Sequence, residues 1–272
     1  MELIRHDRDG VVYHTSPLLD AAGVVHGFST RLGGVSTGEL SSLNLRGSRF
    51  CGDDQTNVEE NYRRFCNAAG VPVSRAVLSV QVHQDTVRTV TEEDAGKGLW
   101  RERDYTADAL MTDAPELPLF VFSADCIVIL LCDSQTGAVG AVHAGWRGTA
   151  MAIAAKTVRE MERVYGTRPV NLRAAIGPGI GQCCFETHDD VPEAMLASPM
   201  GEAARPYLQK TGEKWQVDLK GLNRRQLLLA GVPAEQIAVS SLCTACHPEL
   251  YWSHRKMGDR RGVQVAMIMR KG

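Results

Sequence analysis

The sequence predicts an α/β fold, a single layered domain of helices and mixed sheets. Short runs of strand length alternate along the 272 residues with segments in which apolar side chains recur at helical spacing. Several of these short runs are apolar throughout, which is typical of buried strands. No internal repeat, low-complexity linker or shift in composition divides the chain. One domain over residues 1–272 is therefore the simplest account, and the chain is long enough to bury a sizeable core.

Strands are expected where short apolar or alternating runs end at turn residues. A polar strand pair begins the chain within residues 1–23, with residues 11–13 in one of its strands. The other expected strands are residues 24–30, 77–83, 119–122, 127–131, 138–142, 172–176, 215–219 and 237–242, with residues 251–255 and 262–269 as a closing pair.

Helices are expected where apolar side chains repeat every three to four residues. Residues 54–69 carry Val58, Tyr62 and Phe65 at this spacing and stop at Gly70, a residue typical of helix C-termini. The other expected helices are residues 150–165, a helix that begins at residues 191–196, and residues 222–230. The charged segment 92–105 is expected to form a surface loop.

The central apolar segment contains the residues most indicative of chemistry. A turn at residues 133–137 predicts that the runs before and after it pair as antiparallel strands. Such a hairpin brings Cys126 toward His143, although the two are seventeen positions apart. The polar pair Asp125–Cys126 interrupts the apolar sequence, which is costly unless the pair has a function.

Composition excludes several classes of function. The net charge is −2 with no long basic run, so no nucleic-acid partner is expected. The longest apolar stretch, residues 117–132, is interrupted by Asp125 and is not a membrane span. The N-terminal residues lack the apolar core of a signal peptide, so the eight cysteines are expected to be reduced thiols in a cytoplasmic protein.

Two chemical interpretations of the central residues remain open on the sequence alone. His83, Cys126 and His143 form a plausible catalytic zinc site, with three protein ligands and a fourth position for water. Alternatively, Cys126 is a nucleophile, His143 is its general base, and Asp125 or another acid orients the histidine.

A second group of cysteines resembles half of a zinc knuckle. Cys243 and Cys246 have CxxC spacing and are followed by His247. Their partners would have to be Cys183 and Cys184, which are adjacent and therefore poorly spaced for chelation. The order of residues also differs from that of zinc nucleobase deaminases. We expect this segment to be loop structure rather than a metal site.

Basic and amide side chains near the glycine-rich loops are candidates for substrate binding. Arg31, Arg147 and Arg255 lie in or beside loops, and an arginine can hold an anion through paired hydrogen bonds. Asn44 follows the loop at residues 31–38, which has three glycines but lacks the spacing of a nucleotide-binding motif.

Taken together, the motifs resemble the bacterial YfiH family, also called the polyphenol oxidase or laccase-domain family. The resemblance covers residues 24–268. It rests on residues 26–36 (HGFSTRLGGVS), 42–45 (SLNL), 81–83 (QVH), 107–112 (ADALMT), 124–126 (ADC), 143–148 (HAGWRG), 176–181 (IGPGIG) and 243–244 (CT). The chain departs from the family pattern at Val263, where an arginine is common, and at Lys256, which replaces an arginine.

The resemblance implies a single α/β domain, distantly similar to the necrotizing-factor cysteine hydrolases. It also implies a zinc ion held by His83, Cys126 and His143, the same residues that the chemical argument selects. Members of the family are described as purine nucleoside phosphorylases acting on adenosine, inosine, guanosine and methylthioadenosine, with adenosine deaminase activity. Other descriptions are a copper-dependent phenol oxidase and an enzyme that edits a peptidoglycan precursor.

The function expected from the sequence is therefore a zinc-dependent purine nucleoside phosphorylase that also deaminates adenosine. His83, Cys126 and His143 are the expected catalytic and metal-binding residues. Arg31, Asn44 and Arg147 are expected to bind nucleoside and phosphate. The alternatives are a cysteine amidase acting on a cell-wall precursor, a binding protein with a structural zinc, and a copper oxidase, with copper as the weaker metal choice. The partners expected are small molecules, without nucleic acid or membrane, in a monomer or homodimer.

Overall fold

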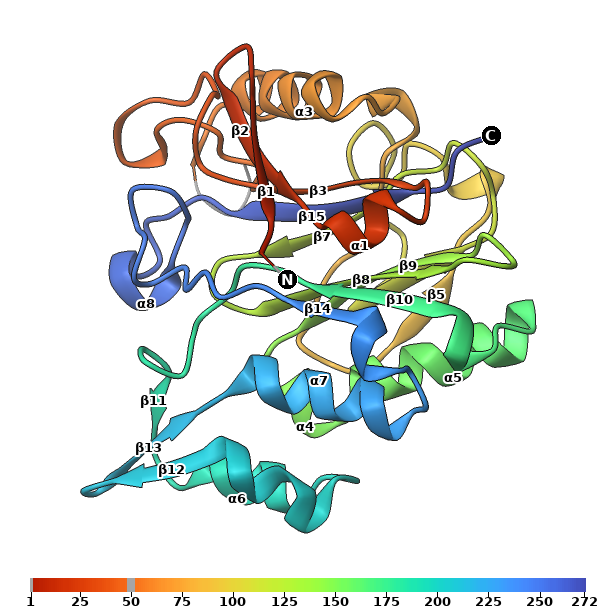
Figure 1. Ribbon diagram of the computed structural model, residues 1–272. Coiled ribbons are helices and arrows are strands. Elements are labelled where there is room, and N and C mark those ends of the chain that lie inside the picture. Colours follow the sequence, from red (N-terminus) through yellow and green to blue (C-terminus); the bar gives the residue numbers. More distant parts are fainter. Residues whose placement is uncertain (1, 48–51) are drawn as a thin grey trace.

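The computed structural model describes residues 2–47 and 52–272, and it contains two six-stranded sheets that lie face to face (Figure 1). Both sheets combine antiparallel and parallel neighbours. In spatial order the first sheet is β1 (Ile4–Arg8), β2 (Val11–Thr15), β3 (Val25–Ser29), β15 (Gln264–Met269), β7 (Leu119–Ser123) and β4 (Val77–Leu78). The second is β14 (Ile237–Val239), β10 (Leu172–Ile176), β8 (Ile127–Asp133), β9 (Val139–Ala144), β6 (Ala109–Thr112) and β5 (Val87–Thr89).

Helices cover the outer faces of the two sheets (Figure 1). Helix α3 (Gln55–Ala69) lies over the first sheet, and α4 (Trp146–Ala150), α5 (Ile153–Tyr165) and α7 (Leu219–Leu229) lie over the second. A small sheet of β11 (Glu186–Thr187), β13 (Lys214–Val217) and β12 (Leu208–Thr211) sits with α6 (Asp190–Leu196) beyond these helices. Two further short helices are α1 (Pro17–Asp20) and α8 (His254–Met257).

The sandwich buries its central strands on both faces, which explains their continuous apolar sequences. In β8, Ile127, Ile129 and Leu131 pack toward the helices, while Val128 and Leu130 pack toward the first sheet. Side chains alternate between the faces of a strand, so one apolar run contributes to two core layers. A third layer lies between α3 and the first sheet.

The predicted antiparallel hairpin is confirmed, and it has an unexpected relation to the strand before it. Strand β8 pairs with β9, with Val128 opposite His143. Strand β7, which precedes β8 in the chain, belongs to the other sheet. The short segment that carries Asp125 and Cys126 is therefore the crossing from one sheet to the other, between the end of β7 and the start of β8.

Apart from shifts of a few residues at the ends of other elements, the predicted elements differ from the structure in three places. The strand expected over residues 77–83 ends at Leu78, and His83 lies in a turn with a φ of 59°. The helix expected over residues 150–165 is broken at Ala152, whose φ of 59° separates α4 from α5. Residues 251–255 do not pair with β15. Instead, the backbone N–H of Trp252 donates to the side-chain oxygen of Gln264, and the side-chain amide of Gln264 donates to the Trp252 carbonyl. Strand β15 lies between β3 and β7.

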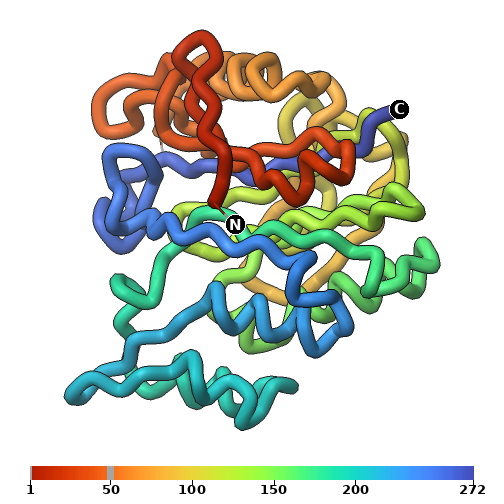
Figure 2. Tube along the Cα trace, viewed as in Figure 1, coloured from red at the N-terminus to blue at the C-terminus, as the bar shows by residue number. Residues whose placement is uncertain are grey.

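Segments from the N-terminal and C-terminal parts of the chain pair within the first sheet. Figure 2 shows the C-terminal segment passing beside the N-terminal segment, and β15 pairs with β3 from Phe28 to Val25. None of the helices in the described residues has the length and apolar character needed to cross a bilayer.

Candidate metal centre

The structure brings together the three residues predicted to bind a metal. The possible ligand atoms of His83, Cys126 and His143 all lie within 4.8 Å of one another. His143 comes from β9, Cys126 from the crossing between the sheets, and His83 from the turn after β4. The two imidazole rings are nearly perpendicular, with centroids 4.9 Å apart. Two imidazoles and a thiolate are ligands that suit zinc.

The buried carboxylate of Asp108 organises two of these ligands. Its Oδ1 lies 2.8 Å from Nδ1 of His143, so Nε2 is the ring nitrogen left for a metal. The same carboxylate accepts the backbone N–H groups of Val82, His83 and Gln84 at 3.0–3.2 Å. Asp108 therefore fixes the ring of one histidine and the turn that carries the other.

Electrostatics favour a thiolate at Cys126. Burial alone would raise the pKa of this thiol, but attraction and hydrogen bonding from His143 and His83 outweigh burial and lower the pKa to about 6. For His143, burial opposes protonation, whereas Cys126 and Asp108 raise its pKa to about 9. The deprotonated thiol is the form that binds metal or acts as a nucleophile.

The backbone leaves room for a ligand at this point. A Cβ on Gly145 would lie 3.1 Å from the His83 ring and 3.2 Å from the Cys126 sulfur, so any larger residue would crowd the site. His83 and Asp125 have positive φ values of 59° and 92°, a backbone conformation that costs energy in residues with a side chain. Such strain concentrates at functional sites.

Asp125 has a structural role at the crossing. Its carboxylate accepts hydrogen bonds from the Thr244 hydroxyl, the Ser253 hydroxyl and the Arg255 backbone N–H at 2.6, 3.0 and 2.7 Å. The acid that orients His143 is Asp108, whereas the sequence interpretation had named Asp125 or another acid for this role.

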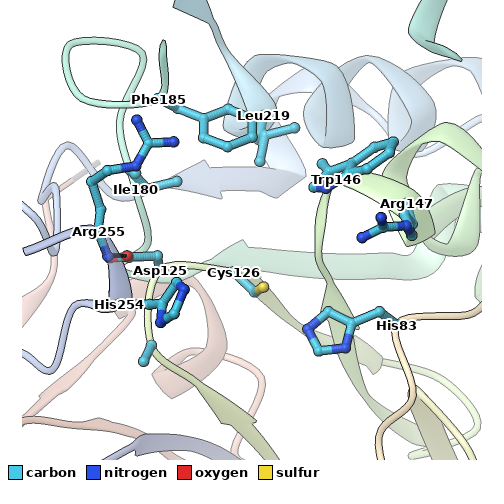
Figure 3. Close-up of a pocket in the computed structure, with 11 residues that line it drawn as sticks. His83, Asp125, Cys126, Trp146, Arg147, Ile180, Phe185, Leu219, His254 and Arg255 are labelled. Atoms are coloured by element: carbon cyan, nitrogen blue, oxygen red, sulfur yellow. Dashed lines mark hydrogen bonds between the residues drawn. The ribbon is translucent and has the colours of Figure 1, made fainter. Parts of the chain in front are cut away.

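Two cavities meet at His83 and Cys126, and His143 lines the second of them. The first, of about 320 Å³, opens beside His83 and Cys126 (Figure 3). In Figure 3, Phe185 and Leu219 line the side opposite Cys126. The remaining lining comes from Ala124, Asp125, Trp146, Arg147, Ile180, His254 and Arg255. This cavity combines aromatic and aliphatic side chains with cationic groups.

The second cavity, of about 220 Å³, is lined by arginines. Arg46, Arg103 and Arg261 contribute to it together with His83, Cys126 and His143, and its described lining contains no carboxylate. Arg103 and Arg261 donate to backbone carbonyl oxygens. The Nε of Arg261 is buried and has no hydrogen-bond partner among the described residues. These features suit an anion.

The three predicted substrate-binding residues have different locations. Arg147 lines the first cavity, where its guanidinium stacks 4.2 Å from the Trp146 ring centroid. Arg31 lines neither cavity. It donates to the carbonyls of Ser41 and Pro248 and stacks 3.9 Å over Trp252. Asn44 also lines neither cavity, and its fully buried amide donates to Asp53 at 2.7 Å.

The structure also assembles the second group of cysteines. The sulfur atoms of Cys183, Cys184, Cys243 and Cys246 all lie within 4.8 Å of one another. The sequence spacing of Cys183 and Cys184 had argued against this arrangement. Adjacent cysteines can both point at one centre here because the glycine-rich loop reverses direction just before them, with the N–H groups of Cys184 and Phe185 both donating to the Gly181 carbonyl.

Sequence reasoning missed several residues of the site. Asp108 lies in the quoted motif at residues 107–112, but a single acid between apolar residues gives no indication of its partner. Phe185 follows the cysteine pair, and Arg103 and Arg261 belong to charged segments with no motif. Only the tertiary fold brings these side chains to the two cavities.

Comparisons with known proteins agree over nearly the whole chain. Residues 25–271 match the family described as multi-copper polyphenol oxidoreductase laccase. Purine nucleoside phosphorylase YlmD of Geobacillus stearothermophilus is 37% identical over 255 residues, 92% of this chain and 91% of that protein. Adenosine deaminase RL5, of an unknown prokaryotic organism, is 34% identical over 259 residues, 93% of this chain and 98% of that protein.

Solved structures agree with this assignment. The crystal structure of YlmD from Geobacillus stearothermophilus has a TM-score of 0.90 and 34% identity, and the match covers 100% of both chains. The Bacillus licheniformis protein YfiH has a TM-score of 0.90 at 32% identity, covering 97% of this chain and 98% of that one. The resemblance seen in the motifs is thereby confirmed, and the chain belongs to the YfiH family of multi-copper polyphenol oxidoreductase laccase proteins.

Proposed function

We propose that this protein is a zinc-dependent purine nucleoside phosphorylase that also deaminates adenosine. The observation that carries the proposal is the meeting of an aromatic cavity and an arginine-lined cavity at His83 and Cys126. Phosphorolysis joins two substrates of different chemistry, an uncharged nucleoside and an anionic phosphate. The names of relatives that are 37% and 34% identical, a purine nucleoside phosphorylase and an adenosine deaminase, support this choice.

His83, Cys126 and His143 are the residues proposed to hold the metal. A zinc ion there would supply a Lewis acid where the two cavities meet. Three protein ligands with an open position are typical of catalytic zinc. Copper sites with two histidines and one cysteine usually have an axial methionine, and no methionine is among the described residues that line the two cavities.

The nucleoside is assigned to the first cavity. A purine is flat and weakly polar, and the side chains of Phe185, Trp146 and Leu219 offer it an aromatic and aliphatic surface. A cavity of about 320 Å³ is at the lower end of the usual range for small-molecule sites. Adenosine, inosine, guanosine and methylthioadenosine are the proposed substrates.

Phosphate is assigned to the second cavity. Arg103 and Arg261 form no salt bridge with a carboxylate in the described chain, so their charges remain available to an anion. A phosphate held there would face the sugar of a nucleoside bound in the first cavity, because both cavities border His83 and Cys126. One phosphate oxygen would then bond to the anomeric carbon as the bond from that carbon to the purine breaks. Arg147, in the first cavity, remains the alternative phosphate ligand.

The experiment is an assay with inosine at increasing phosphate concentration. We expect hypoxanthine release in proportion to added phosphate, with ribose 1-phosphate formed in equal amount. Adenosine should yield adenine and some inosine, since deamination consumes water instead of phosphate. Hypoxanthine release that does not depend on phosphate would contradict phosphorolysis.

The second candidate is a cysteine amidase acting on a cell-wall precursor. It is favoured by one observation, the alignment of Cys126, His143 and Asp108 as a nucleophile, a base and an orienting acid. Removal of metal with a chelator separates the two candidates. Activity on nucleosides should stop and return with added zinc. Apo-protein that still hydrolyses a cell-wall precursor and leaves nucleosides unchanged would establish the amidase.

A further inference from the structure

Four cysteine sulfurs from two distant parts of the sequence converge outside the proposed active site. Cys246 Sγ lies 3.6 Å from Cys183 Sγ and 3.4 Å from Cys184 Sγ, and Cys183 Sγ lies 3.9 Å from Cys184 Sγ. Cys243 completes the group within 4.8 Å. A tetrahedral zinc with Zn–S bonds of about 2.3 Å requires sulfur atoms about 3.8 Å apart. The observed separations are close to this value.

Two loops are held in position to present these sulfurs. A parallel β-bridge joins Gly179 to Cys243, and the Thr244 N–H donates to the Gly179 carbonyl at 3.2 Å. The Gly181 N–H donates to Cys243 Sγ at 3.1 Å, a contact that stabilises a thiolate. A Cβ on Gly181 would lie 3.2 Å from Cys183 Sγ and from Cys243 Cβ, so the absent side chain leaves space for the cluster.

The charges around the cluster suit an anionic centre. A zinc ion with four thiolates carries a net charge of about −2. Lys220 is only 6% exposed, and its ammonium donates to the carbonyls of Ser240 and Leu242, immediately before Cys243. The guanidinium of Arg255 donates to the Cys184 carbonyl at 3.1 Å. Neither cation forms a salt bridge with a carboxylate among the described residues, and the charge of Lys220, which is buried, requires compensation.

A disulfide explains this arrangement less well. Its two sulfurs lie about 2.05 Å apart, and a bond between one pair would leave the other two thiols without a role. All the cysteines in the described residues are free. Four sulfurs within 4.8 Å of one another are typical of a closed structural zinc site, in which the protein supplies every ligand.

We propose that Cys183, Cys184, Cys243 and Cys246 bind a structural zinc ion, separate from the metal of the active site. This ion would join the loop that carries Ile180 and Phe185 to the loop that carries Thr244. Ile180 and Phe185 line the first cavity, and Thr244 holds Asp125 next to Cys126. The second zinc would therefore fix the wall of the cavity without touching the substrate. The proposal does not depend on the proposed function.

The test measures zinc in protein purified under reducing conditions without chelator. The decisive variant is His83→Ala, which removes a ligand of the first site and leaves all four cysteines intact. It should retain about one zinc per chain, and X-ray absorption at the zinc edge should show sulfur ligands only, at about 2.3 Å. Retention of no zinc, or of zinc with nitrogen or oxygen ligands, would overturn the proposal.

Cysteine variants provide the complementary measurement. Cys246→Ser should lose one equivalent of zinc relative to the wild type, and Cys246→His, which keeps a zinc ligand, should restore it. Cys66→Ala is the matched control, because Cys66 is a buried thiol on α3, and its zinc content should equal that of the wild type. Titration of thiols in His83→Ala protein that was purified without reductant and then denatured should find every cysteine reduced. A deficit of two thiols would establish a disulfide instead. If Cys246→Ser fails to fold, the His83→Ala measurement still decides the question.

Discussion

The two groups of possible metal ligands differ in whether they line a cavity and in the number of ligands they offer. His83, Cys126 and His143 would provide three ligands where two cavities meet, with His83 and Cys126 lining both cavities and His143 the second. The four cysteines would provide four ligands on paired loops, and none of them lines either cavity. Three ligands leave a coordination position for a reacting molecule, whereas four close the coordination sphere. The ligand count therefore predicts that His83, Cys126 and His143 form the chemical group, whose metal takes part in the reaction. The four cysteines are then the structural group, whose metal only holds the loops together.

Asp125 connects the two groups. It precedes Cys126 in the chain, and its carboxylate accepts hydrogen bonds from Thr244 and Arg255. Thr244 follows Cys243, and Arg255 contacts the carbonyl of Cys184. Asp125 therefore links the loops that carry the four cysteines to the segment that carries Cys126. Comparing variants of each group measures how strongly they are coupled.

The largest difference is expected between Cys126→Ala and Cys246→Ser. Cys126→Ala removes a proposed metal ligand, so phosphorolysis and deamination should both fall by more than the roughly 100-fold that loss of an outer-shell partner costs. Cys246→Ser should lose much less of both activities, because Cys246 lines neither cavity and would affect only the position of the wall of the first cavity. The measurement is kcat/KM for inosine and adenosine with zinc content determined in parallel. Equal losses in the two variants would show that the division between chemical and structural groups is wrong.

An intermediate effect is expected for Asp108→Asn. The variant keeps the shape of the side chain but removes the charge that orients His143 and accepts three backbone N–H groups. Loss of such a partner typically lowers metal affinity or activity by about 10- to 100-fold. Asp85→Asn is the control, since Asp85 lies in the same turn and only pairs with Lys156 at the surface. A competition assay with a zinc-binding dye measures the affinity. Equal affinities for the two variants would contradict an orienting role for Asp108.

Much of the fold could be predicted from the sequence because local signals agree with the tertiary structure. The hairpin of β8 and β9 has apolar strands and a turn rich in polar residues, so the approach of Cys126 to His143 was predictable. The strand at residues 172–176 was predicted with the correct bounds. The segment around His83 was harder, because three backbone amides bind the distant Asp108 and impose a turn on an alternating sequence.

The candidate site was predictable only where its residues belong to motifs. The three proposed metal ligands were identified by residue type and by resemblance. Arg31 and Asn44 were selected because they adjoin a glycine-rich loop, but that loop packs against residues 41–44, and their side chains support its conformation. The four-cysteine group was recognised in the sequence but interpreted as loop structure, because adjacent cysteines are poorly spaced for chelation. Its two halves are far apart in the sequence, and the β-bridge between Gly179 and Cys243 that brings them together has no local sequence signal.

The smallest expected effect concerns the assignment of phosphate to the second cavity. Arg261→Gln removes a charge whose buried Nε has no partner in the described structure. A hydrogen bond to a charged group contributes about 1.5–3 kcal/mol, so the KM for phosphate should rise by roughly tenfold or more, with a much smaller change in the KM for inosine. The neighbouring Arg260 is the matched control, because its side chain is 82% exposed and pairs only weakly with Glu39, so Arg260→Gln should leave both constants unchanged. If Arg147→Gln raises the KM for phosphate and Arg261→Gln does not, phosphate binds in the aromatic cavity, and the two cavities do not divide the substrates as proposed.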